Sequence, residues 1–95
     1  MALMSDLRSV WVFNGARSQF PSGIFSSVAN AETWIRSKAL TGTLTQYPID
    51  ISAYEWALNN RYFTPRKPEQ ESAEFIGRFS DASQEHYHYE NGERA

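Results

Sequence analysis

The sequence of 95 residues contains no cysteine. This absence excludes disulfide bonds, thiolate metal sites and cysteine nucleophiles together. The net charge is also small: the chain has nine Lys and Arg side chains and eleven Asp and Glu side chains, which gives a formal net charge of −2. A nearly neutral chain makes no strong electrostatic field, so we expect no partner among nucleic acids or anionic membranes.

Long apolar runs are absent as well. The longest uninterrupted runs have four residues, whereas a membrane-spanning helix needs about 20. The apolar start at residues 1–4 is too short for the apolar region of a signal peptide, and Asp6 and Arg8 follow it. We therefore expect a soluble, cytoplasmic protein.

Aromatic residues, in contrast, are plentiful: they make up 15% of the chain, and 41% of all residues are hydrophobic. Disordered chains lack so many rings, and the length suits one domain with a modest core. We expect a flexible N-terminal arm at residues 1–7, a single α+β domain at residues 8–90 and a frayed C-terminus at residues 91–95.

The first predicted strand is Val10-Trp11-Val12-Phe13, and Asn14-Gly15 is a turn signal that ends it. A half-buried strand alternates apolar and polar residues, but this strand is apolar on both sides. It should therefore lie within the sheet with both faces covered, by helices, by the rest of the chain or by a second subunit. Ile24-Phe25 begins a second short strand, which we expect to pair antiparallel with the first.

Residues 28–40 have the pattern of an amphipathic helix. Ser26 and Ser27 precede it as candidate caps, and Glu32 and Arg36 form an i,i+4 pair on its outer side. The apolar residues that recur on one helical face are Ala31, Trp34, Ile35 and Ala39.

A third strand and a second helix follow. Residues 43–47 alternate and are rich in β-branched side chains, which predicts a strand that Pro48 terminates. Asp50 or Ser52 can cap the second helix, and Ser52 and Glu55 have the spacing of a capping box, which predicts that a helix begins there. Residues 64–72 contain two prolines and balanced charge, as is typical of an exposed connector.

Residues 75–79 fit either a helix or a strand. Gly77 costs a helix about 1 kcal/mol, so we predict a strand here. Residues 85–90 form the last predicted strand, with Tyr87 and Tyr89 on one face. The predicted fold class is α+β: a mainly antiparallel sheet with two helices, in the order β-β-α-β-α-β-β.

The other face of this last strand carries His86, His88 and Glu90. Residues two apart on a strand point the same way, and two imidazoles with a carboxylate resemble the ligand set of several divalent-metal sites. These three residues are the candidate metal ligands, and a divalent metal is the only cofactor that the sequence suggests. The alternative interpretation is the solvated polar face of an edge strand.

Motifs of catalysis are absent. The chain has no G-x-S-x-G, no phosphate-binding glycine loop and no H-E-x-x-H, so we predict no catalytic residue. Trp56 lies off the apolar stripe of the second helix, which makes it a candidate surface anchor, since Trp is enriched at binding hot spots. The candidate binding residues are Trp11, Phe13, Trp56 and Tyr87.

Several ordered segments resemble a family of small uncharacterised bacterial proteins, a domain of unknown function. The segments are VWVFNG (residues 10–15), FPSGIF (20–25), AETWI (31–35), LTGTLTQYP (40–48), FIGRF (75–79) and HYHYE (86–90). This resemblance implies a bacterial, cytoplasmic protein. It assigns no activity and no catalytic residue.

The sequence favours a non-enzymatic binding or interaction module, for which we consider a homodimer and a small accessory or immunity-type protein. The aromatic content, a strand that is apolar on both faces and the lack of reaction motifs lead to this hypothesis. The alternative is a small metal- or small-ligand-binding protein that uses the His-x-His strand face. An enzyme that uses these groups without a metal is a third hypothesis.

Overall fold

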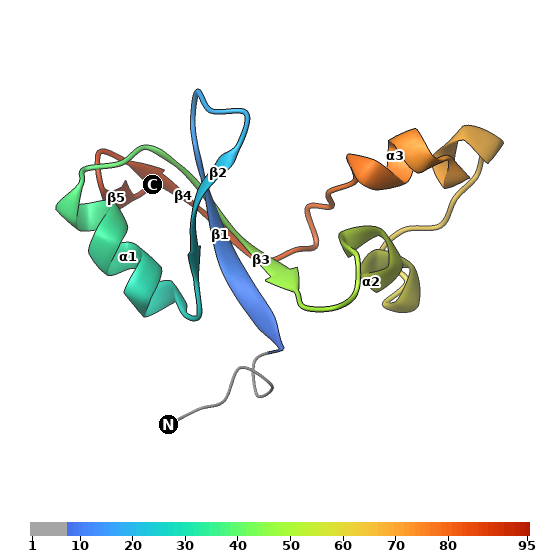
Figure 1. Cartoon of the computed structure of the whole chain (residues 1–95), viewed down its shortest axis with the longest axis horizontal. Coiled ribbons are helices and arrows are strands. Elements are labelled where there is room, and N and C mark those ends of the chain that lie inside the picture. Colours follow the sequence, from blue (N-terminus) through green and yellow to red (C-terminus); the bar gives the residue numbers. More distant parts are fainter. Residues whose placement is uncertain (1–7) are drawn as a thin grey trace.

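A computed structural model describes residues 8–95, and within them the chain forms one sheet of five strands and three α-helices (Figure 1). The predicted α+β class with a mainly antiparallel sheet is confirmed. In chain order the elements are β1 (Ser9–Gly15), β2 (Pro21–Phe25), α1 (Val28–Ser37), β3 (Gly42–Pro48), α2 (Ala53–Asn59), a 3₁₀ helix (Pro68–Glu71), α3 (Ala73–Gly77), β4 (His86–Glu90) and β5 (Glu93–Arg94).

The strands lie in the order β2-β1-β3-β4-β5, and all neighbours are antiparallel. The first predicted strand therefore has a strand on each side. In the register, Trp11 lies opposite Phe25 and Gln46, and Phe13 lies opposite Gly23 and Leu44. Because side chains alternate between the two faces of a sheet, this register decides which residues share a face.

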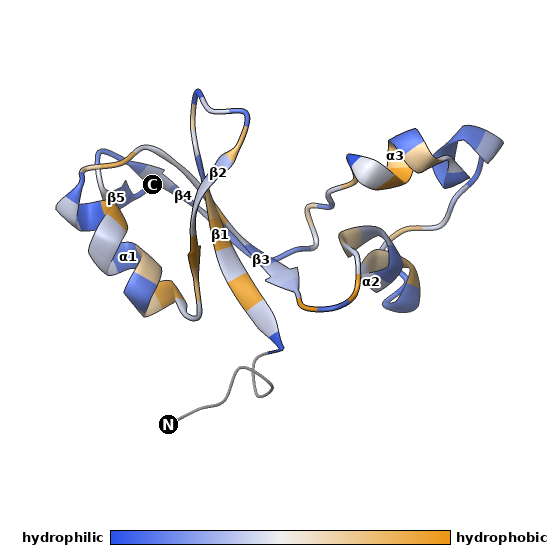
Figure 2. Cartoon of the chain, in the orientation of Figure 1, coloured by the Kyte–Doolittle hydropathy of each residue, from blue (hydrophilic) through white to orange (hydrophobic). Residues whose placement is uncertain are grey.

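Helix α1 covers one face of the sheet. It begins after Ser27, whose hydroxyl oxygen accepts a hydrogen bond from the Asn30 amide at 3.1 Å. Trp34 meets Phe13 edge to face, with 5.5 Å between ring centroids, and Figure 2 shows apolar bands on both β1 and α1. The buried core between helix and sheet consists of Trp11, Phe13, Ala31, Ile35, Leu44 and Tyr89.

The segment between β3 and β4 leaves the sheet and forms a helical unit, residues 52–79, that projects to one side (Figure 1). Helix α2 is capped as predicted, because the Glu55 amide donates to the Ser52 hydroxyl at 3.0 Å. The unit has a small core of its own, with Tyr54 6% exposed. The rings that pack together there, with centroids 5.1 to 6.2 Å apart, are Tyr54, Phe63, Phe75 and Phe79.

The prediction of a strand at residues 75–79 is wrong, because this segment begins within helix α3. Ser72 caps the helix by accepting a hydrogen bond from the Phe75 amide at 3.1 Å. Phe75 and Phe79, four residues apart, both pack against Tyr54. Gly77 is the last residue of the helix, so its cost is smaller than at an interior position. Ring packing and the cap outweigh that cost.

The C-terminal residues differ from expectation as well. Residues 91–95 are not frayed: Glu93–Arg94 forms β5, which pairs with β4. Gly92, at φ +87°, supplies the left-handed backbone that the turn requires. The arm expected at residues 1–7 lies outside the described residues.

Candidate functional site

The sheet has one face that α1 does not cover. In β1 the side chains of Trp11 and Phe13 pack toward α1, so the alternate residues Val10 and Val12 point to the other side. The strand register assigns the residues that share this side. We call this surface the open face; its members are Val10, Val12, Asn14, Ile24, Thr43, Thr45, Tyr47, His86, His88 and Glu90.

The open face is partly apolar and reaches the solvent. Ile24 is 67% exposed, while Val10, Val12 and Tyr47 are partly buried. Among residues 8–95, α1 packs on the opposite side of the sheet (Figure 1), and α2 contacts β3. The prediction that β1 is covered on both faces therefore holds for only one face within residues 8–95.

The four candidate binding residues do not form one surface. Trp11 and Phe13 are 7% and 1% exposed, so these two core residues leave no side-chain surface for a partner. Tyr87 stacks on Trp11 with 5.7 Å between ring centroids, on the α1 side of the sheet. Trp56 belongs to α2 and lines a hollow of about 260 Å³ beside Gln46 and other residues at the end of the sheet.

The residues that sequence reasoning missed are the apolar members of the open face. Val10 and Val12 were expected to be covered, and Ile24 and Tyr47 were assigned only to strands. The alternation of side-chain direction along β1 indicates that Val10 and Val12 share one face. Which residues of β2 and β3 join them depends on the cross-strand register, which long-range pairing sets and the sequence alone does not give.

The structure brings His86 and His88 together on the open face, with 5.3 Å between ring centroids. The Nδ1 atom of His86 lies 2.8 Å from the Gln84 carbonyl oxygen. The Nδ1 atom of His88 lies 3.3 Å from the Thr43 hydroxyl oxygen on β3. Residues 8–95 contain no group of three His, Cys, Asp or Glu placed to hold a metal ion, so Glu90 does not complete a three-ligand site within one chain.

The strongest electrostatic cluster lies on the other side of the sheet and joins α1 to the C-terminal hairpin. The Tyr89 hydroxyl donates to the Glu32 carboxylate at 2.6 Å, and Arg94 binds the same oxygen. The Tyr89 hydroxyl, and after it Arg94, hold the pKa of Glu32 below its ordinary value. Burial, together with the Glu32 carboxylate, raises the pKa of Tyr89 to about 12. Because each group is bonded to another, the cluster serves to fasten the hairpin.

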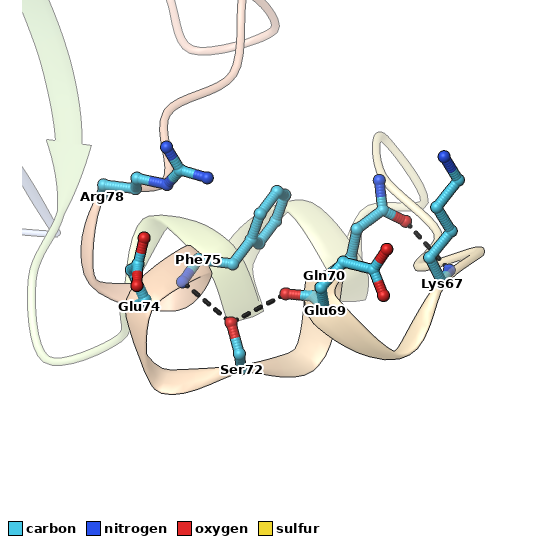
Figure 3. Close-up of a pocket in the computed structure, with 7 residues that line it drawn as sticks. All are labelled: Lys67, Glu69, Gln70, Ser72, Glu74, Phe75 and Arg78. Atoms are coloured by element: carbon cyan, nitrogen blue, oxygen red, sulfur yellow. Dashed lines mark hydrogen bonds between the residues drawn. The ribbon is translucent and has the colours of Figure 1, made fainter.

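Another hollow, of about 350 Å³, lies on the helical unit (Figure 3). Its hydroxyl group is engaged locally: the Ser72 hydroxyl donates to the Glu69 carbonyl oxygen and accepts from the Phe75 amide. The charges around it are mixed, so they favour neither anions nor cations. The residues that line it are Lys67, Glu69, Gln70, Ser72, Glu74, Phe75 and Arg78.

Within residues 8–95, no helix is both long enough and apolar enough to cross a membrane. Comparison with curated proteins and with solved structures found no match. A family model described as Domain of unknown function (DUF7710) matches residues 10–95. Since the match spans nearly the whole chain, the resemblance to a family of unknown function is confirmed, and the chain belongs to this family.

Proposed function

We propose that this protein is a non-enzymatic interaction module that self-associates through the open face. The observation that carries the proposal is that β1 lies between two other strands yet presents Val10 and Val12 on a side that α1 does not cover. Apolar sheet faces are normally buried against a second layer of structure. A second chain can supply that layer.

A second copy fits this face by charge and by symmetry. The apolar side chains of Val10, Val12 and Tyr47 have Thr43 and Thr45 as neighbours, so this part of the face requires no partner of opposite charge. A two-fold axis along the strands, between β1 and β3, would place Val10 of each copy opposite Tyr47 of the other. Such an isologous contact uses the same patch on both subunits.

The size of the face sets the expected strength of the dimer. Four strands spaced by about 4.8 Å and about five residues long give a footprint of roughly 300–400 Å². A stable interface buries about 800 Å² per partner. We therefore expect a weak dimer whose population rises with concentration.

Light scattering after size exclusion tests this proposal, from tens of micromolar to about 1 mM. The variant Ile24→Lys places a charge on the open face at a position that is 67% exposed, so folding should be preserved. The matched control is Ile76→Lys on α3, a position that is 37% exposed. The wild type and the control should approach the mass of two chains, while Ile24→Lys stays at one.

Two results would overturn the proposal: a wild-type chain that stays monomeric over the whole range, or Ile24→Lys associating as strongly as Ile76→Lys. Circular dichroism of both variants shows whether the fold is retained. We place the module in the bacterial cytoplasm, which the resemblance to small bacterial proteins supports.

A further inference from the structure

We propose that His86 and His88 together bind one divalent transition-metal ion, such as Cu²⁺, Ni²⁺ or Zn²⁺, on the open face. This site goes beyond the proposed self-association and does not depend on it. The chain contains two histidines and no cysteine. These two side chains are therefore its only imidazoles, the ligands that such ions prefer when thiolates are absent.

The spacing of the two rings suits a single ion. Residues two apart on a strand have Cα atoms about 6.5–7 Å from each other, but the ring centroids of His86 and His88 are only 5.3 Å apart. The rings therefore lean toward each other. A tetrahedral zinc ion with Zn–N bonds of about 2.0–2.1 Å holds the centroids of two imidazoles roughly 5.2 Å apart. The observed separation matches this value.

The hydrogen bonds leave the correct nitrogen of His86 free. A carbonyl oxygen can only accept, so the Nδ1 atom that lies 2.8 Å from the Gln84 carbonyl carries the hydrogen. In the neutral ring the lone pair is then on Nε2, the atom that a metal would bind. Metal-ligating histidines commonly donate their other ring nitrogen to a backbone carbonyl in this way, which fixes the orientation of the ring.

The carbonyl that orients His86 is itself held firmly. Gln84 is 2% exposed. Its side-chain amide donates to the Gln46 carbonyl at 3.1 Å and accepts from the Asp81 amide at 3.0 Å. His88 has a corresponding neighbour on β3, because the Thr43 hydroxyl lies 3.3 Å from its Nδ1 atom. Both rings thus have a partner at Nδ1.

The charges beside the pair favour a cation. Glu90 continues the same face of β4, and Glu93 lies opposite it on β5. Neither completes a ligand set of three, so water or an outside ligand would fill the remaining coordination positions. For such a site we expect affinity in the order Cu²⁺ above Ni²⁺ and Zn²⁺, with no measurable binding of the oxygen-preferring ions Mg²⁺ and Ca²⁺.

Calorimetry on untagged full-length protein, freed of metal with a chelator, tests the site by titration with CuCl₂, NiCl₂ and ZnCl₂. We expect one ion per chain in the wild type. His86→Ala and His88→Ala should each weaken binding by more than about tenfold. The double variant keeps all eleven acidic residues, so it measures binding to every group other than the two imidazoles. Electron paramagnetic resonance of the Cu²⁺ complex should show two imidazole nitrogens in the wild type and one in each single variant.

Binding by the double variant as tight as by the wild type would overturn the site, as would a Cu²⁺ spectrum with no nitrogen couplings. The same titration on Ile24→Lys separates this proposal from the proposed function, because this variant should stay monomeric and still bind the ion. A wild-type chain that binds the ion but stays monomeric supports the metal site and refutes self-association. A wild-type chain that dimerises but binds no ion supports self-association and refutes the metal site.

Discussion

Replacing Gly42 by alanine should strongly destabilise the protein. Gly42 lies on β3 between Gly15 of β1 and Tyr89 of β4, so three strands meet at this position. A Cβ atom there would lie 2.2 Å from the Asn14 carbonyl oxygen and 2.7 Å from the ring of Phe13. Heavy atoms normally meet at about 3.5–4.0 Å. The paired strands would therefore have to separate by roughly 1 Å.

The loss of stability in Gly42→Ala depends on which atoms the new methyl group would meet. Inserting a carbon into a packed site typically costs about 1–3 kcal/mol. Here the nearest atom is backbone of the partner strand, and the second is the ring of Phe13, which is 1% exposed. We therefore expect the upper end of that range, about 3 kcal/mol. In a domain of this size such a loss lowers the melting temperature by about 12–24 °C.

Gly77→Ala is the matched control, because a Cβ atom at Gly77 would meet nothing within 4 Å. Gly77 is the last residue of α3 and its φ is not positive, so alanine should stabilise the chain by about 0.4 kcal/mol, the lower end of the usual range. Urea unfolding followed by tryptophan fluorescence, with thermal melts by circular dichroism, measures both variants. An unchanged midpoint for Gly42→Ala, or an equal loss for Gly77→Ala, would refute the reasoning.

Three further predictions concern the cluster of Glu32, Tyr89 and Arg94 and the helical unit. Tyr89→Phe removes the hydroxyl that donates to Glu32 and should cost about 1.5–3 kcal/mol; a smaller loss in thermal melts would show that Arg94 alone secures the carboxylate. Because the pKa of Glu32 is held below its ordinary value of 4.5, its contribution is present above pH 4.5 and is lost as the pH falls through the lowered value. Acid titration of the wild type should show this loss, and Glu32→Gln should reduce it; parallel curves would contradict the assignment. Ser72→Ala removes the cap of α3 and should cost about 1 kcal/mol, measured by urea unfolding, whereas no change would mean that ring packing alone fixes the helix.

Sequence reasoning succeeded where a local signal is sufficient. Residue type and spacing predict Ser26 or Ser27 as the cap of α1 and Asp50 or Ser52 as the cap of α2, and the hydroxyls of Ser27 and Ser52 accept the amide hydrogen bonds. The pairing of His86 and His88 on one face also follows from the period of a strand. These features depend on residues no more than three positions apart.

Sequence reasoning failed where distant residues decide. Glu32 was paired with Arg36 on its own helix, but its carboxylate binds Tyr89 and Arg94, which are 57 and 62 positions away. Residues 75–79 were assigned to a strand because the local cost of Gly77 was visible, while the packing of Phe75 against Tyr54 was not. In both cases a tertiary contact replaced or outweighed the local preference.

The open face results from where the connections between the strands lie. The β1–β2 connection is a short loop at residues 16–20 and the β4–β5 connection is a turn at residues 91–92, so neither supplies a second layer over the sheet. Helix α1 covers one face, and the long connection from β3 to β4 builds the helical unit beside the sheet (Figure 1). Tyr54 and its neighbouring rings thus form a second small core. The residues of this connection form the core of the helical unit and do not form a layer over Val10 and Val12. A full second layer over the open face would therefore have to come from outside residues 8–95.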